Sequence, residues 1–340
     1  MVPLRFVIIG GGPGGTQAAT TAARLGAEVT LIEADVVSGA AHLWDCIPSK
    51  AMIATGGAMS FARRYQGMGL VETPPQFDLD ATRDRVNSIE DSLEHAARTL
   101  LESQGVRVVM GRGKLIDDNT VEVALNVPDE TGATSVRFEA DAVLLSTGSR
   151  PRLPDWAGVD GERVLSTRDA YPPSQLPEKL VVIGSGVTGV EFVHMFSSLG
   201  SAVGLVVSRQ QVLPDKDPEV AAALEENFIE RGVELYKGAR AETIEQTESG
   251  VIVACNDGRR IEGSHALLAI GSIPNTEDLG LENTGVDTDH GYVITNDHHL
   301  RTSVPHIYVA GDISGKLPLS SVATMPVSYT HLTLPTICSV

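Results

Sequence analysis

The order of apolar and polar positions predicts a strand, a helix and a second strand within the first 35 residues. An apolar run over 4–9 leads into a glycine-rich turn, followed by an alanine-rich stretch and then by a second apolar run over 28–32. Such a succession is typical of a parallel strand that turns into a helix and returns as the next strand. The segment therefore predicts a complete βαβ unit, and the same pattern returns at 179–209.

Between the two units, apolar residues at helical spacing predict a packed helix within 79–105. The residues in this spacing are Val86, Ile89, Leu93, Ala96, Ala97, Leu100 and Leu101. Short strands are expected over 106–110, 120–125 and 135–140, followed by “DAVLLSTGSRPRLP”, an apolar strand that ends in a Gly-Ser turn and prolines. We interpret the turn and prolines as a linker between domains.

The second half of the chain repeats this arrangement. After the second βαβ unit, 218–238 predicts a helix and a strand, and “HALLAIGSIPNT” repeats the strand that ends in Gly-Ser. A last strand in “HIYVAGDISG” delivers Asp312 just beyond its end. Ligands of doubly wound sheets lie at that end of the strands.

Composition predicts a soluble α/β protein of about two domains, at roughly 150 residues each. The 340 residues are 42% hydrophobic and 21% charged, and no apolar run approaches the roughly 18 residues of a membrane span. The N-terminus has no signal-peptide pattern, so we expect a cytoplasmic protein without stable membrane insertion. The net charge of −18 argues against a nucleic-acid partner. Cys46, Cys255 and Cys338 are too few and too scattered for a disulfide framework or a metal site.

The first glycine-rich turn has the spacing of a dinucleotide-binding fingerprint. Gly10, Gly12 and Gly15 form G-x-G-x-x-G, in which one glycine allows the tight turn, one the approach of a pyrophosphate and one close helix–strand packing. The helix N-terminus would face the phosphates. Glu33 follows about 20 residues on, where a carboxylate accepts from the ribose hydroxyls. Together these features predict dinucleotide binding.

A second fingerprint predicts a second dinucleotide site. Gly184, Gly186 and Gly189 repeat the spacing after a strand and before a helix. An enzyme that uses only a nicotinamide cofactor needs one such site, so two sites indicate a chain that carries FAD as well. An internal duplication with one inactive site is the alternative.

Six motifs occur in the order in which one enzyme family carries them. They are the two fingerprints, “CIPSK”, “STGSRP”, “AIGSIPNT” and “YVAGD”. Over about 4–325 the chain resembles the flavoprotein disulfide reductases, the family of dihydrolipoamide dehydrogenase, glutathione reductase and mercuric reductase. The resemblance implies an α/β fold with two Rossmann-like, doubly wound domains. An FAD domain from 1–150 and 273–325 would hold an NAD(P)H domain inserted over 151–272.

The same resemblance assigns candidate site residues. Those for FAD are Gly10, Gly12, Gly15, Glu33, Lys50, Gly113 by backbone contact, Gly148, and Asp312 at the ribitol. Those for the nicotinamide cofactor are Gly184, Gly186, Gly189 and Gly271. Lys50 and Glu191 would form an ion pair beside the flavin, where a fixed cation stabilises charge on the reduced ring.

One departure from the family pattern decides the expected activity. The disulfide reductases read C-x-x-x-x-C before I-P-S-K, and Cys46 corresponds to the second cysteine, whereas the first position is Ala41. An alanine can neither form the redox disulfide nor attack a disulfide substrate. Cys255, within an expected strand of the inserted domain, is interpreted as a buried apolar residue. Cys46 remains a candidate catalytic thiolate beside the flavin or, alternatively, a small buried side chain.

Without the dithiol, the acceptor must take electrons directly from the flavin, which suits a quinone. The pattern resembles the actinobacterial NAD(P)H-quinone reductases, which lack the redox disulfide, and Ser272 in “GSIPN” agrees with that subgroup. We therefore predict an NAD(P)H-quinone oxidoreductase. A dihydrolipoyl dehydrogenase-type disulfide reductase and an inactive, truncated FAD-binding pseudoenzyme are the alternatives.

The end of the second strand in the inserted domain predicts a preference for NADPH over NADH. Enzymes selective for NADH carry a carboxylate at this place to accept from the ribose 2′-hydroxyl. Here the strand ends in Val207, Ser208 and Arg209. Ser208 can donate to a 2′-phosphate and Arg209 can pair with it, although an ordinary exposed arginine is the alternative.

The last residues predict a non-native tail. After Met325 the family continues into a C-terminal interface domain, whereas this chain reads “PVSYTHLTLPTICSV” over 326–340. The tail has no helical period and resembles translated adapter sequence, so no role is expected for Cys338. The interface domain would be missing, and the homodimer of the full-length family would not be assembled by this chain.

Overall fold

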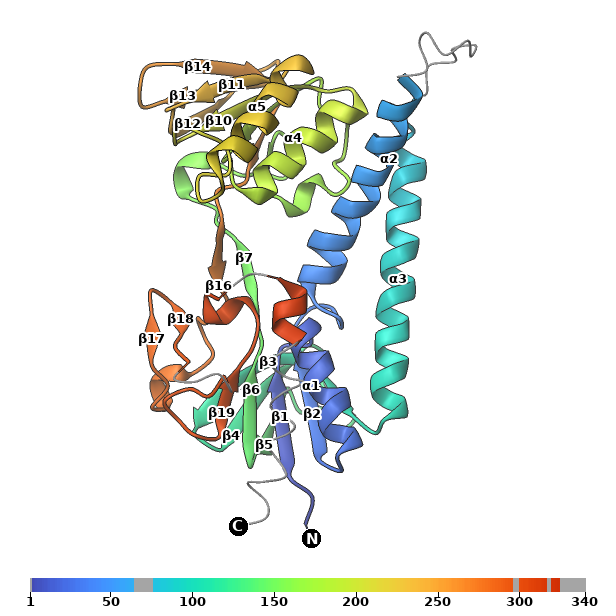
Figure 1. The fold of residues 1–340 in the computed structure, drawn as a ribbon. Helices are drawn as coiled ribbons and strands as arrows, with labels where there is room; N and C mark the ends of the chain where they lie inside the picture. The colour runs from blue at the N-terminus through green and yellow to red at the C-terminus, as the bar shows by residue number, and fades with distance from the viewer. Residues whose placement is uncertain (1, 64–75, 296–299, 317–318, 325–340) are drawn as a thin grey trace. The chain divides into compact units, whose positions relative to one another are not determined.

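The computed structural model of the chain describes residues 2–63, 76–295, 300–316 and 319–324 (Figure 1). The predicted non-native tail over 326–340 lies outside these residues. In the described part of the chain, no helix is both long and apolar enough to cross a lipid bilayer.

The chain divides into two compact units, each built from separate segments. The first contains Met1–Trp44, Ile89–Arg150 and the chain from Ile273 onward, and the second contains Asp45–Ser88 and Pro151–Ser272. The chain therefore changes unit after Trp44, Ser88, Arg150 and Ser272, and the third of these changes lies within the stretch that the sequence analysis interprets as a linker. The segment Asp45–Ser88, which the sequence-based division puts in the first domain, groups with the second unit because its helix contributes to that unit's core.

A seven-stranded sheet forms the centre of the first unit, in the order β19-β6-β1-β2-β3-β4-β5. Its strands are β1 (Arg5–Ile9), β2 (Glu28–Glu33), β3 (Arg107–Asp117), β4 (Thr120–Leu125), β5 (Ser135–Glu139), β6 (Ala142–Leu145) and β19 (Ile307–Val309). The pairs from β19 to β3 are parallel, and the predicted βαβ unit is formed by β1, α1 (Pro13–Arg24) and β2.

Both faces of this sheet are buried, which explains the continuous apolar runs. Alternate residues of β1 point to opposite faces. Phe6 and Ile8 pack in a cluster with the alanines of α1, whereas Val7 and Ile9 pack in a cluster on the other face. Burial on both sides thus specifies the register of the central strand.

Strand β3 is longer than the sequence suggests, because it takes part in two kinds of pairing. Its first residues pair in parallel with β2, and from Gly111 onward it pairs antiparallel with β4. A Cβ on Gly111 would collide with the carbonyl oxygen of Ala124, so a glycine allows the two strands to approach at this point.

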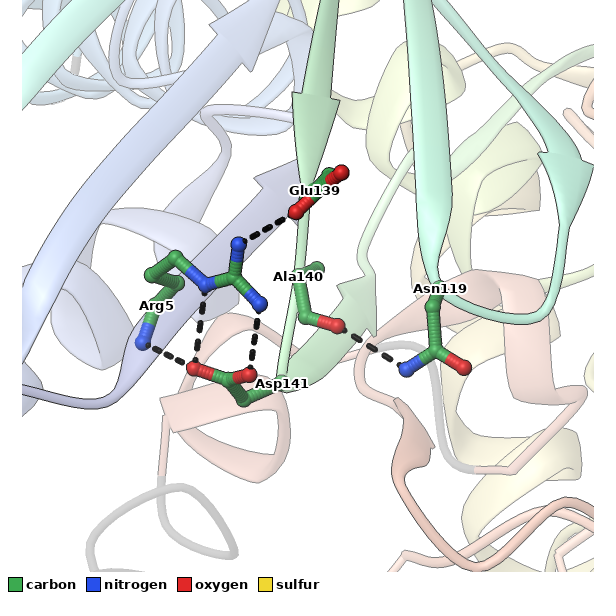
Figure 2. Close-up of polar contacts among 5 residues, drawn as sticks. All are labelled: Arg5, Asn119, Glu139, Ala140 and Asp141. Atoms are coloured by element: carbon green, nitrogen blue, oxygen red, sulfur yellow. Dashed lines mark hydrogen bonds and ion pairs between the residues drawn. The ribbon is translucent and has the colours of Figure 1, made fainter.

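Polar contacts stabilise the amino-terminal end of the same sheet (Figure 2). The Arg5 guanidinium donates to both carboxylate oxygens of Asp141, at 3.2 and 2.8 Å, and to Glu139 at 2.7 Å. Asn119 donates to the carbonyl oxygen of Ala140 at 2.9 Å. These contacts lie at the end of β1 opposite to the glycine-rich turn, and the Arg5 side chain lowers the pKa of Asp141.

The second unit contains a five-stranded parallel sheet in the order β11-β10-β9-β15-β8 and a three-stranded antiparallel sheet. The first comprises β8 (Val164–Leu165), β9 (Lys179–Ile183), β10 (Ala202–Val207), β11 (Glu234–Lys237) and β15 (His265–Leu268). The second comprises β12 (Ala241–Gln246), β13 (Val251–Cys255) and β14 (Arg260–Gly263), and the main helices are α2 (Ile47–Arg63), α4 (Val187–Leu199) and α5 (Pro218–Glu230).

The core of this unit has helices on one face of the parallel sheet. Leu180 and Val182 of β9 pack with Phe192 and Phe196 of α4 and with Met52 of α2. Both phenylalanines are fully buried, and each such burial contributes about 1.5–3 kcal/mol. On the opposite face, the other residues of β9 pack against the antiparallel sheet.

Helix α3 (Leu79–Ser103) forms where the periodicity predicts it, but the expectation that its whole apolar stripe packs is wrong. Val86 and Leu101 are buried, whereas Leu93 and Leu100 are 39% and 50% exposed. Helical spacing determines which side chains share a face of the helix. Whether another element covers that face depends on tertiary packing.

Short elements complete the chain. They are β7 (Ser149–Pro151), β16 (Ser272–Pro274), β17 (Thr288–Asp289), β18 (Tyr292–Val293) and 3-10 turns at Asp155–Ala157, Arg168–Ala170, Leu281–Asn283 and Asp312–Ser314. β7 and β16 pair with each other where the chain leaves and re-enters the first unit. Asn275 reinforces the pairing, because its side chain donates to Thr147 O at 2.9 Å and its own carbonyl accepts from Thr147 Oγ1 at 2.6 Å.

Candidate functional site

Two glycines of the first glycine-rich turn, Gly10 and Gly15, have no room for a side chain. Gly10 has φ +106°, and a Cβ there would collide with the backbone of Ser146 in the neighbouring segment. A Cβ on Gly15 would collide with the carbonyl oxygen of Gly10. Ser146 Oγ donates to that same oxygen at 2.7 Å. The glycines therefore bring helix α1 directly against the end of β1, as the fingerprint predicts.

The N-terminus of α1 presents bare backbone amides. Gly12 is the N-cap residue and supplies no side-chain cap, and Pro13 begins the helix. The first N–H groups of a helix have no partner within it and carry its positive dipole end. This arrangement fits an anionic group such as a pyrophosphate.

Glu33 ends strand β2 beside this turn and is 9% exposed. Its carboxylate accepts from the N–H of Gly11 at 2.6 Å and from the N–H of Asp35 at 2.8 Å. Burial raises the pKa of Glu33, although the backbone donors lower it. Burial of a carboxylate lowers the free energy of unfolding, and buried titratable groups of this kind occur at ligand sites.

The second glycine-rich turn reproduces the first one. Gly184 has φ +112°, and a Cβ there would collide with the backbone of Ala269. A Cβ on Gly189 would collide with the carbonyl oxygen of Gly184, and Gly186 is an N-cap without a side-chain cap. The two sequence fingerprints thus form the same local structure in the two units.

The strand order locates each turn at a topological switch point. In the first unit the chain moves from β1 to β2 on one side and later to β6 on the other side of β1. In the second unit β10 and β15 flank β9 in the same way. Open parallel sheets bind ligands in the crevice at such a point, beyond the carboxyl ends of the strands.

The two units differ at the strand that follows the helix. Val207 ends β10 and is fully buried, at the place where Glu33 ends β2 in the first unit. Ser208 and Arg209 come next and are both exposed. No carboxylate ends this strand, as the sequence indicates.

The other predicted glycines have different surroundings. Gly148 and Gly271 have φ +67° and +96° and open space around them, so each allows a left-handed turn just after a parallel strand. Gly113 lies inside β3, where a Cβ would lie 3.1 Å from a methyl group of Ile9. Close packing therefore accounts for Gly113, and its predicted backbone contact with FAD remains a prediction.

Asp312 lies just beyond β19, as the sequence predicts, and begins a 3-10 turn. Its carboxylate accepts from Ser149 Oγ at 2.8 Å. The parallel strands β6 and β19 are neighbours, so their ends bring Ser149 and Asp312 together. Asp312 thus lies at the same end of the sheet as Gly10 and Glu33.

The ion pair between Lys50 and Glu191 is present. Lys50 Nζ of α2 lies 3.1 Å from both carboxylate oxygens of Glu191 on α4, and both helices belong to the second unit. The side chains are 58% and 34% exposed, so the pair is accessible to a ligand. The Lys50 ammonium thus lies beside a carboxylate of a neighbouring helix.

Ala41 and Cys46 are the first and last residues of a six-residue π-helix, which the sequence analysis does not predict. In a π-helix, residues five apart lie one turn from each other. A cysteine at position 41 would therefore lie next to Cys46, but this position is an alanine. Cys46 itself is exposed. Cys255 is buried in β13, as expected, and burial raises its pKa.

Sequence reasoning missed two neighbours of the ion pair. Ser49, 2% exposed, donates to the carbonyl oxygen of Cys46 at 2.9 Å and lies 3.4 Å from Lys50 Nζ. Tyr171 stacks on Phe192, which directly follows Glu191 in α4. The serine is visible in “CIPSK”, whereas nothing in the sequence connects Tyr171 to this site.

Fold and site agree with one protein family. The family model of the pyridine nucleotide-disulphide oxidoreductases matches residues 4–326, and the chain belongs to this family. A protein of Mycobacterium tuberculosis named NAD(P)H dehydrogenase (quinone) is 44% identical over 328 residues, which cover 94% of this chain and 66% of that protein. Dihydrolipoyl dehydrogenase 2 of Haloarcula marismortui is 32% identical over 97% of this chain and 72% of its own length.

A solved structure has the same fold. The crystal structure of LpdA from Mycobacterium tuberculosis has a TM-score of 0.89 and 41% sequence identity, over 98% of this chain and 72% of that one. The chain thus spans about two thirds of the length of these relatives. The family and its two-unit fold predicted from the sequence are confirmed.

Proposed function

We propose that the chain is a flavin-dependent oxidoreductase that passes hydride from NAD(P)H to FAD and then electrons to a quinone-type acceptor. The observation that carries the proposal is Ala41 at the start of the π-helix. Without a thiol one turn from Cys46, no redox disulfide can stand between flavin and acceptor. The acceptor must then react with the flavin itself.

The local geometry fits both cofactors. In each glycine-rich turn the backbone is not covered by side chains, and the helix that follows has no side-chain cap at its N-terminus. Both features suit a pyrophosphate. We assign FAD to the first unit because Glu33 and Asp312 add carboxylates there for the ribose and ribitol hydroxyls. Bound FAD would supply the two-electron chemistry that no side chain can provide.

The role proposed for Lys50 and Glu191 is electrostatic. The Lys50 ammonium would stabilise negative charge that develops on the reduced cofactor, and Glu191 would hold the ammonium in place. For the nicotinamide cofactor we infer a preference for NADPH. Ser208 and Arg209 are exposed where a 2′-phosphate would lie, and no carboxylate repels it.

The names of similar proteins are consistent with this proposal and with one alternative. The Mycobacterium tuberculosis relative is named as a quinone dehydrogenase, whereas several relatives at 31–34% identity are named dihydrolipoyl dehydrogenase. Lipoamide reduction requires a thiolate to attack the substrate disulfide. Ala41 removes one of the two sulfurs that this chemistry needs, so we favour the quinone reaction.

An anaerobic titration tests the proposal. FAD-loaded protein should lose its flavin absorbance completely with one equivalent of NADPH, because only the flavin can hold the two electrons. Menadione should then restore the absorbance, whereas lipoamide should not. Restoration by lipoamide would support the disulfide reductase instead. A flavin that NADPH and NADH both fail to reduce would indicate a protein that binds the cofactor without turnover.

A further inference from the structure

Glu225 is a charged residue on the packed face of α5. It follows Ala221 by four positions and precedes Phe228 by three, and both of those side chains are buried in the core of the second unit. Residues at this spacing share a face of a helix. The Glu225 side chain is itself only 12% exposed. A carboxylate on such a face needs partners, because an unpaired buried charge is costly.

Both carboxylate oxygens of Glu225 have a partner. Oε1 accepts from the backbone N–H of Val212 at 2.9 Å, and Oε2 accepts from Lys237 Nζ at 2.8 Å. Lys237 ends β11 and is the parallel partner of Val207, the last residue of β10. Glu225 thus connects α5 to the end of β11 and to the loop that follows β10.

This loop, 208–213, is also held by the backbone on both sides of the Glu225 contact. Near its start, the carbonyl oxygen of Arg209 accepts from the N–H of Gly238 at 3.0 Å. At its end, the N–H of Leu213 donates to the carbonyl oxygen of Ser185 in the second glycine-rich turn, at 2.8 Å. The loop therefore runs from the end of β10 back to the turn that is expected to hold the pyrophosphate.

We infer that Glu225 is a positioning residue for nucleotide specificity. By accepting from Val212 it holds the loop 208–213 in the conformation in which Ser208 and Arg209 receive a ribose 2′-phosphate. The inference rests on the proposed function for the assignment of this loop to NADPH. Glu225 acts without touching the nucleotide, since its carboxylate is turned to Val212 and Lys237. The Lys237 ammonium also compensates a negative charge that would otherwise repel the phosphate.

Two ligands that cannot reduce the flavin test the positioning. 2′-Phospho-ADP-ribose carries the 2′-phosphate and ADP-ribose lacks it, so the ratio of their dissociation constants reports on the contacts to that phosphate. Isothermal titration calorimetry of the FAD-loaded full chain measures both constants. The wild type should prefer the phosphorylated ligand. Glu225→Ala should reduce this preference by about threefold to tenfold, the range of one hydrogen bond.

Glu225→Gln and Glu234→Ala are the matched variants. Glu225→Gln keeps a carbonyl oxygen that can accept from Val212, so it should retain most of the preference. Glu234→Ala removes another ion pair of the same unit, with Lys179 at 2.7 Å, and Glu234 lies at the opposite end of β11. This variant should leave the preference at the wild-type value.

Three results would overturn the inference. One is an unchanged preference in Glu225→Ala with native circular dichroism. Another is an equal loss of preference in Glu234→Ala, which would indicate a general effect on the unit. The third is a wild-type chain that shows no preference for the phosphorylated ligand. Failure of the proposed function has a different result, because NADPH would then leave the bound FAD oxidised although Glu225→Ala shifts the binding ratio as expected.

Discussion

Glu33 and Val207 end equivalent strands in the two units. Glu33 places a buried carboxylate at this position, whereas Val207 places a buried apolar side chain there. Each strand pairs in parallel with the strand that enters a glycine-rich turn. The same backbone therefore offers two different environments to a ribose. This difference separates the two proposed cofactors more clearly than the glycines do.

Replacement of Glu33 by Gln should weaken FAD binding and destabilise the first unit. The carboxylate accepts from Gly11 and Asp35, and an amide would direct its NH2 group at one of these backbone donors. We expect a loss of about 1–3 kcal/mol in the free energy of unfolding. Urea denaturation and FAD fluorescence measure the two effects. Asp35→Asn, which keeps the backbone donor, is the control, and equal effects of both variants would contradict the prediction.

Alanine at the third glycine of each fingerprint should affect one unit at a time. A Cβ on Gly15 or Gly189 would collide with the carbonyl oxygen of the first glycine of its motif. Each change should cost about 1–3 kcal/mol. Gly15→Ala should abolish retention of FAD, and Gly189→Ala should abolish reduction by NADPH while FAD is retained.

Gly57→Ala is the control for this pair. Gly57 lies in helix α2 with open space around it, so alanine should stabilise the protein by up to about 1 kcal/mol. Loss of FAD in both fingerprint variants would mean that the two turns do not serve separate cofactors.

Arg209→Ala should raise the Michaelis constant for NADPH by about tenfold and leave that for NADH nearly unchanged. The expected loss is that of one charge-assisted contact to a 2′-phosphate. Steady-state kinetics with both nucleotides provide the internal control. An unchanged constant for NADPH would make Arg209 an ordinary surface residue.

Lys50→Ala should slow flavin reduction by about 10–100-fold, since a fixed positive charge is removed from a partly exposed site. Cys46→Ser should keep most quinone reduction, because no partner thiol faces it across the π-helix. Stopped-flow absorbance after mixing with NADPH measures both variants. Comparable losses in the two would return Cys46 to a catalytic role.

Stability should fall below about pH 6.5 because of the buried His265. His265 is 3% exposed, and burial, with Arg163 nearby, lowers its pKa. The folded chain therefore prefers the neutral imidazole. The neutral His265 imidazole contributes to the free energy of unfolding at pH values above the histidine pKa of the unfolded chain. This contribution is lost as the pH falls towards the lower pKa that His265 has in the folded chain. Thermal unfolding at pH 8 and pH 5.5 should show a smaller difference in His265→Gln than in wild type or in exposed His95→Gln.

The sequence by itself determined the features that depend on neighbours in the chain or on the chemistry of one side chain. The spacing of Gly10, Gly12 and Gly15 predicts a close strand–helix turn, and a Cβ on Gly10 or Gly15 would collide with backbone atoms. The alanine at 41 excludes a disulfide between positions 41 and 46 in any fold. The periodicity of 79–105 predicts helix α3 to within two residues.

Tertiary structure decided which residues meet across long stretches of chain: the Lys50–Glu191 pair was expected only from the family resemblance, and the Ser149–Asp312 contact was not expected. Lys50 and Glu191 are 141 residues apart, and Ser149 and Asp312 are 163 apart. Their contacts follow from how α2 packs on α4 and from the pairing of β6 with β19. Likewise, Leu93 and Leu100 belong to an apolar stripe that no described element buries. Periodicity assigns side chains to a face of a helix or strand, whereas the contacts of that face depend on the register and packing of distant segments.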